Sequence, residues 1–199
     1  MQEETSTQEL EGRLALIESM IAEGRRTTES WGWTFVLWGV AYYVAIAWAT
    51  WGRSTLAWPV TMIAAAVLTG ILASRIAVKN PETTIGRAML AIWVGMGISL
   101  FILMFSLGVT GRLDTHVSVA IVGAMLGCAN ATSALILKWK MQFASALVWW
   151  VVAVVACLGT ETQSSIAFLI AIFLCQIVFG IYGMIRESRK KALRGAAHA

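Results

Sequence analysis

The chain has 199 residues, of which 58% are hydrophobic and 13% are charged, and its formal net charge is +4. Soluble domains contain about 45–50% apolar and 25% charged residues, so this composition excludes an ordinary soluble domain and indicates a membrane protein. The basic residues lie at the ends of hydrophobic stretches and not along one polar face, which excludes a nucleic-acid-binding surface.

An amphipathic helix is predicted over residues 6–23. Ser6 and Glu9 have capping-box spacing, and four apolar residues recur on one face of the helix, namely Leu10, Leu14, Ile17 and Ile21. The other positions are mainly acidic, whereas helices that lie on a membrane surface usually carry Lys and Arg there. We therefore expect this apolar stripe to contact a protein partner or a second copy of the chain. Packing of the helix on its own bundle is the alternative.

Six hydrophobic stretches follow, each of roughly 20 residues, the length that a helix needs to cross about 30 Å of hydrocarbon. Arg75 is the only Arg within them, and they contain no Asp, Glu or Lys. We predict an all-α fold, a polytopic bundle of six transmembrane helices over residues 31–51, 56–77, 89–109, 116–137, 141–158 and 165–185. Residues 1–28 would form a cytoplasmic N-terminal segment, 29–187 the transmembrane domain and 188–199 a basic cytoplasmic tail.

Local signals at the helix ends support these spans. Capping residues stand at the expected starts, and a glycine stands at the end of the third span: Asn80 before Pro81, Gly111, Asp114 or Thr115, and the capping-box pair Thr160 and Gln163. Lys138, Trp139 and Lys140 must form a short turn, because a single helix over residues 116–158 would be about 65 Å long, twice the thickness of the hydrocarbon.

The basic residues predict the orientation of the bundle. If six helices are threaded in order, twelve basic residues fall on one side of the membrane and two, Arg53 and Arg112, on the other. The positive-inside rule then places both termini in the cytoplasm, and we expect a cell membrane of the bacterial inner-membrane type. The first span is too long for the apolar region of a cleavable signal peptide, so we expect it to act as an uncleaved anchor.

The transmembrane stretches contain no ionisable residue at mid-membrane, which argues against proton-coupled antiport, intramembrane proteolysis and b-type haem. We therefore predict no catalytic residue, no cofactor and no metal site. The candidates for an interior polar site or pocket are two amides and the neighbours of the first of them: Asn130, Gln176, Cys128, Thr132 and Ser133. One interpretation is that the amides join helices by hydrogen bonds, and the other is that they line a solute path or pocket.

Three further groups of residues receive an interpretation. Helix–helix packing is predicted at small residues that share a helix face, namely Gly123, Gly127, Ala131, Gly180 and Gly183. The basic run after the last span can anchor the helix end or bind anionic lipid, through Arg186, Arg189, Lys190, Lys191 and Arg194. Cys128, Cys157 and Cys175 match no disulfide or zinc pattern, so we expect them to be buried as small apolar residues.

These features favour a non-enzymatic accessory or regulatory membrane protein that acts by association, either with a partner or with itself. The alternative is a transport component, either a passive facilitator of small solutes or the membrane subunit of an ATP-driven exporter. That alternative depends on architecture alone. The expected partners are membrane lipid and a protein bound through the N-terminal helix.

Overall fold

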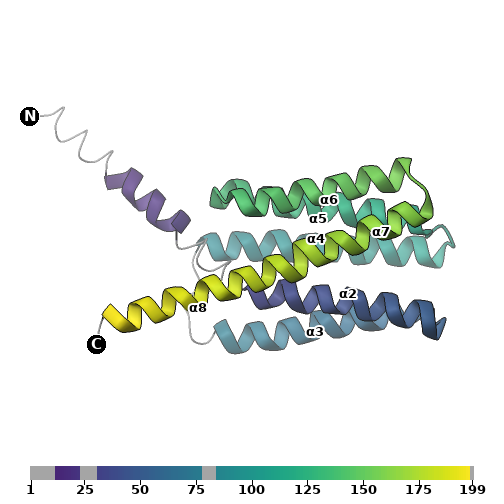
Figure 1. The fold of residues 1–199 in the computed structure, drawn as a ribbon, viewed down its shortest axis with the longest axis horizontal. Helices are drawn as coiled ribbons and strands as arrows, with labels where there is room; N and C mark the ends of the chain where they lie inside the picture. The colour runs from purple at the N-terminus through teal and green to yellow at the C-terminus, as the bar shows by residue number, and fades with distance from the viewer. Residues whose placement is uncertain (1–11, 23–30, 78–83, 198–199) are drawn as a thin grey trace, which may run out of the picture.

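The computed structural model is an all-α bundle, and it describes residues 12–22, 31–77 and 84–197 (Figure 1). Six helices in this part of the chain are long and apolar enough to cross a membrane. The first five are α2 (Gly32–Gly52), α3 (Ala57–Ala77), α4 (Thr84–Val109), α5 (Thr115–Leu137) and α6 (Lys140–Leu158). The sixth runs continuously through α7 (Glu161–Ile172), a π-helical segment η1 (Phe173–Val178) and α8 (Phe179–Ala197). The predicted six-helix fold is thus confirmed, and the chain is a multi-pass membrane protein.

Three helix ends lie where local chemistry predicts them. The Asp114 side chain accepts a hydrogen bond of 2.8 Å from the backbone N–H of Val117 and caps α5. At the start of α7, Thr160 and Gln163 form the capping box, with hydrogen bonds of 2.9 and 3.3 Å. Gly111 follows the end of α4 with φ +67, in the left-handed region that glycine tolerates without strain.

The turn between α5 and α6 is as short as predicted and contains no glycine. Lys138 adopts the left-handed conformation, with φ 48, and the backbone N–H of Trp139 donates to the carbonyl of Ala134 at 2.9 Å. The side chains of Leu137 and Trp139 are 0% and 5% exposed. Burial of these two flanking side chains holds Lys138 in a conformation that a β-carbon disfavours.

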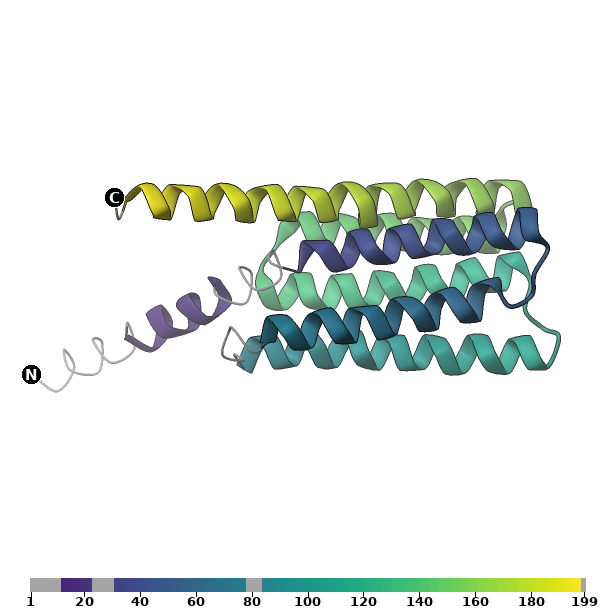
Figure 2. The ribbon, with the colours of Figure 1, turned by 90° about the horizontal axis from the view of Figure 1, so that it is seen from below.

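Consecutive spans run antiparallel, so the bundle has two ends (Figures 1 and 2). The Lys138 end holds the α5–α6 turn, the start of α2 and the part of α8 that extends beyond the other helices. The Asp114 end holds the α2–α3, α4–α5 and α6–α7 connections. The described basic residues that flank the spans divide as the threading predicted. Arg53 and Arg112 lie at the Asp114 end, and the others at the Lys138 end are Arg75, Arg87, Lys138, Lys140, Arg186, Arg189, Lys190, Lys191 and Arg194.

Two hydrophobic clusters hold the bundle together. The first, here the Trp149 cluster, includes Tyr42, Leu126, Trp149, Phe168 and Cys175. In it, the Phe168 ring lies 5.9 Å from Tyr42 and 5.9 Å from Trp149, in edge-to-face contacts. The second, here the Phe179 cluster, lies nearer the Lys138 end and consists of Phe35, Met89, Leu137, Trp139 and Phe179. Phe179 of α8 joins α2 and the α5–α6 turn there, because its ring lies 5.1 Å from Phe35 and 5.2 Å from Trp139.

The helices α3 and α4 lie at the edge of the bundle. Only 11% of the most apolar window of α3 and 6% of that of α4 are buried, so both helices offer most of their surface to lipid. One indole nitrogen ties α3 to α2, since Trp38 Nε1 donates to Thr69 Oγ1 at 3.2 Å. The Trp93 ring ties α4 to α2 by an edge-to-face contact with Phe35 at 5.5 Å.

The N-terminal helix is described over residues 12–22, and Figure 1 draws it beyond the Lys138 end of the bundle. Two of the predicted stripe residues are well exposed, Leu14 at 60% and Ile17 at 52%, and Ile21 is half-buried. Leu16 and Met20, which the predicted stripe omitted, are exposed too and widen the apolar face. The predicted stripe residue Leu10 and the predicted caps at Ser6 and Asn80 lie outside the described residues.

Candidate functional site

A layer of buried polar side chains separates the two hydrophobic clusters. It consists of Asn130, Ser133, Gln142, Ser145 and Gln176, and we call it the polar layer. Asn130, Ser133 and Gln142 are 0–1% exposed, and the other two are at most 6% exposed. On α5 the polar positions fall between Leu126 of the Trp149 cluster and Leu137 of the Phe179 cluster. Along α6 and along the sixth span, the polar residues likewise lie between residues of the two clusters.

Close contact between α5 and α6 sets the geometry of the layer. A β-carbon on Gly123 would lie 2.9 Å from the carbonyl oxygen of Trp149 and 3.0 Å from the nitrogen of Ala153, so the two backbones nearly touch there. Because the helices are antiparallel, equal steps from this point towards the turn bring Ser133 level with Gln142 and Asn130 level with Ser145.

Several polar atoms of the layer have no hydrogen-bond partner among the described residues. Asn130 donates from Nδ2 to the carbonyl of Leu126 at 2.8 Å, which leaves its Oδ1 unpaired. The Ser133 hydroxyl and both the Oε1 and the Nε2 of Gln142 are also unpaired. An unsatisfied buried polar group costs about 1–3 kcal/mol of folding free energy, so a native structure retains such a group only for a reason.

The sixth span contributes its π-helical segment to this layer. Cys175 donates from Sγ to the backbone carbonyl of Ser145 at 3.8 Å, which fixes the level of η1 against α6. On the other side, a β-carbon on Gly39 would lie 2.7 Å from Cδ1 of Ile177 and 2.9 Å from Cβ of Gln176, so the missing side chain on α2 lets η1 approach closely. Single π-helical turns within α-helices occur frequently at functional sites.

The structure brings together three of the five predicted interior residues. Asn130, Ser133 and Gln176 lie in the polar layer, and Thr132 is half-buried beside it. The expectation that Cys128 faces the interior is wrong, because its side chain is exposed. Two residues along a helix rotate the side chain by roughly 200°, so burial of Asn130 turns Cys128 outward.

The cysteines as a group also differ from the prediction, since Cys128 and Cys157 are exposed and Cys175 alone of the three is buried. In a membrane bundle the outward face meets hydrocarbon, which solvates a small apolar thiol as well as the interior does.

Sequence reasoning missed Gln142 and Ser145. Both belong to one helical face that continues through Trp149, Val152 and Ala156, and all five side chains are buried. The signal was the spacing of three and four residues that joins this polar pair to the large apolar residues of α6. Gln142 is also close to Lys140, at a depth where polar residues are common. A glutamine at this position therefore did not by itself indicate a buried polar site.

The predicted packing residues lie at helix contacts or are buried. Gly123 and Gly127 face α6, where a β-carbon on Gly127 would strike the indole ring of Trp150. A β-carbon on Gly180 would lie 2.7 Å from the carbonyl oxygen of Gly32, so α2 and α8 cross closely there. Ala131 and Gly183 are buried.

Polar contacts at the Asp114 end hold helices together. His116 Nδ1 lies 2.9 Å from the carbonyl oxygen of Ala156 and 3.4 Å from Ser164 Oγ. A carbonyl oxygen only accepts, so this contact assigns the proton to Nδ1, and the Ser164 hydroxyl donates to the carbonyl of Thr160 at 2.9 Å. Asp114 is engaged in the α5 cap, which leaves His116 without a carboxylate partner from that residue. Within the described residues, no group of three His, Cys, Asp or Glu side chains is placed to hold a metal ion.

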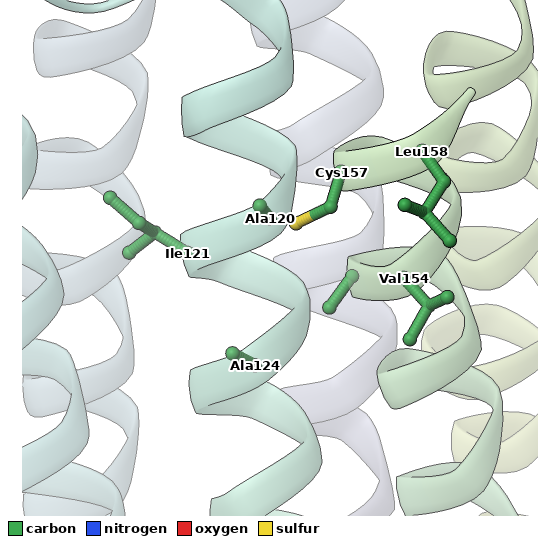
Figure 3. A pocket seen from close by; sticks show the side chains of 7 residues that line it. Ala120, Ile121, Ala124, Val154, Cys157 and Leu158 are labelled. Carbon is green, nitrogen blue, oxygen red and sulfur yellow. The ribbon is translucent and has the colours of Figure 1, made fainter. Parts of the chain in front are cut away.

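A groove of about 530 Å³ runs between α5 and α6 on their outward surface (Figure 3). Its lining side chains are small or aliphatic and include Ala120, Ala124, Val154, Cys157 and Leu158. The lining carries no charged group, so the groove presents only apolar surface to its surroundings.

The basic run begins within α8 at the Lys138 end. Arg186 is half-buried and Arg189 is exposed, while the side chains of Lys190, Lys191 and Arg194 lie outside the description. Comparison of the chain with protein families, with curated proteins and with solved structures finds no match.

Proposed function

We propose that the protein is an accessory or regulatory membrane protein without catalytic activity, and that it acts by association through its N-terminal helix. The observation that carries this proposal is the exposure of Leu14, Ile17 and Met20 along one face of a short helix outside the membrane bundle, with Leu16 exposed at the edge of that face. Burial of a Leu or Ile side chain is worth roughly 1.5–3 kcal/mol, so these side chains favour a contact that covers them.

Protein is a better cover for this helix than anionic lipid. Over residues 6–23 the predicted helix carries Glu9, Glu11, Glu18 and Glu23 against a single basic residue, Arg13, and the basic pair Arg25 and Arg26 follows it. Anionic headgroups repel an acidic helix, whereas a protein surface can present basic residues to it. The expected partner is a protein with an apolar groove and a basic rim, or a second copy of this chain.

The orientation is inferred from the basic residues. We propose that the Lys138 end faces the cytoplasm of a bacterial-type inner membrane, because the basic residues gather at that end. The N-terminal helix and the extension of α8 would then meet partners in the same compartment.

A paired substitution tests the association. Leu14→Asp with Ile17→Asp removes two apolar contacts worth about 3–6 kcal/mol, which corresponds to at least about a 100-fold weaker association. Ala15→Asp with Ser19→Asp adds the same charge on the opposite face of the helix and serves as the control. The readouts are the mass of the particle in nanodiscs and the proteins that co-purify from the native host.

We expect the first variant to lose a partner or dissociate while its unfolding midpoint stays unchanged, and the control to behave as the parent chain. If both variants keep the parental mass and the same co-purifying proteins, the N-terminal helix does not mediate association.

The polar layer favours transport as the second candidate function. Uncharged hydrogen-bonding groups beside a π-helical turn are suited to a path for small uncharged solutes. Solute flux into proteoliposomes that is lost in Gln142→Leu and retained in Leu14→Asp would favour transport over association.

A further inference from the structure

We propose that the polar layer is a water-binding site, in which ordered water joins Gln142 to Ser133 and Asn130 between α5 and α6. The proposal is independent of the association described above, because it concerns the interior of the bundle. It starts from four unpaired atoms: Asn130 Oδ1, Ser133 Oγ, and the Oε1 and Nε2 of Gln142.

These atoms match the hydrogen-bonding capacity of water. Asn130 Oδ1 and Gln142 Oε1 accept, Gln142 Nε2 donates, and the Ser133 hydroxyl does either. A water molecule donates two hydrogen bonds and accepts two, so one molecule can satisfy groups of both kinds at once. All the groups are uncharged, which gives the site no charge to hold an ion in a low-dielectric interior.

The packing limits the size of the ligand. At Gly123 the α5 and α6 backbones approach so closely that a β-carbon would lie 2.9 Å from the carbonyl oxygen of Trp149. Gln142 and Ser133 lie nearer the turn in the same interface, and both are 0% exposed. Full burial of both side chains in so close an interface limits the proposed ligand to the size of water.

The surroundings explain how water is both retained and supplied. The Trp149 and Phe179 clusters close the layer on its two sides along the bundle axis. Gln142 lies within one helical turn of Lys140, which begins α6 and is exposed. A brief opening at Trp139 would therefore connect the layer with the solvent at the Lys138 end.

The test is nuclear magnetic resonance of the unmodified chain in micelles, with its Gln and Asn side chains labelled with nitrogen-15. We expect the amide protons of Gln142 to show cross-peaks to water with the sign of the diagonal, the mark of water held for longer than nanoseconds. Gln163 supplies the matched control, because it is exposed at the Asp114 end and its capping-box contact uses Oε1 and not the amide protons. In Gln142→Leu, the corresponding water cross-peaks of the Asn130 amide should disappear.

Two outcomes would overturn the proposal. One is a Gln142 amide with no water cross-peak and with direct contacts to Asn130 or Ser133, which means that the side chains bond each other in a dry interior. The other is a Gln142 cross-peak with the same sign as that of Gln163, which means an amide open to bulk water. Both outcomes are read on the unmodified chain, so the test holds even if Gln142→Leu does not fold.

Discussion

The α5–α6 interface predicts a large effect for one added methyl group. In Gly123→Ala, the new β-carbon would lie 2.9 Å from the carbonyl oxygen of Trp149 and 3.0 Å from the nitrogen of Ala153. Both obstacles are backbone atoms of α6, so no side-chain rotation relieves the contact and the two helices must move apart. Such overpacking costs about 1–3 kcal/mol, while replacement of a helical glycine by alanine returns up to about 1 kcal/mol of helix propensity.

With the full return of helix propensity, the net expectation is a loss of up to about 2 kcal/mol of unfolding free energy for Gly123→Ala. Gly127→Ala is the first comparison, because its β-carbon meets the indole ring of Trp150 and not backbone. That ring is 38% exposed and can rotate towards lipid, so the loss should be smaller. Gly95→Ala on α4 is the second comparison, since nothing lies within 4 Å of its β-carbon, and it should be neutral or stabilising.

The assay is equilibrium unfolding in mixed micelles, followed by tryptophan fluorescence, with the four proteins compared under one set of conditions. The expected order of stability is Gly95→Ala at or above the parent, then Gly127→Ala, then Gly123→Ala. Trp150→Ala combined with Gly127→Ala should recover the loss attributable to the collision. A Gly123→Ala variant as stable as Gly95→Ala would refute the close approach of α5 and α6.

Two further predictions concern topology and capping. Phosphatase fused after Arg53 or Glu161 should be active and phosphatase fused after Lys140 or Ala199 inactive, and an active fusion at Ala199 would invert the proposed orientation. Asp114→Ala should lower the unfolding free energy by about 1 kcal/mol, because it removes the hydrogen-bond acceptor for the first turn of α5. Asp114→Asn keeps a side-chain acceptor, so it should keep most of this stabilisation. Equal stability of Asp114→Ala and the parent would show that the cap contributes nothing.

The spans and most of their ends could be predicted because they depend on local chemistry. Length and hydrophobicity define the helices, and Asp114, Thr160 and Gly111 act within one turn of their own positions. The left-handed Lys138 could not be predicted, since it depends on burial of its neighbours Leu137 and Trp139 by other helices.

The polar layer was only partly predictable. Asn130 and Gln176 stand out in the sequence because an amide in hydrocarbon needs a partner, but Gln142 lies beside a charged turn where an amide is ordinary. The outward orientation of Cys128 escaped prediction for a different reason. Lipid and protein interior are both apolar, so hydrophobic periodicity does not separate the two faces of a membrane helix. The π-helical turn carries no local signal and arises where the sixth span packs against Gly39 and Ser145.

Because the sixth span is one continuous helix, the directions in which the side chains at its C-terminal end point are fixed relative to the rest of the span. From Glu161 to Ala197 the chain is helical without a break, about 55 Å in all, so its far end turns with the segment beside Gln176. One inserted residue before Arg186 would rotate the basic run by roughly 100° about the helix axis, whereas an insertion of about one full turn would nearly restore its direction. Any surface that docks on the extension of α8 therefore meets side chains whose directions are fixed by the same continuous helix that carries Gln176.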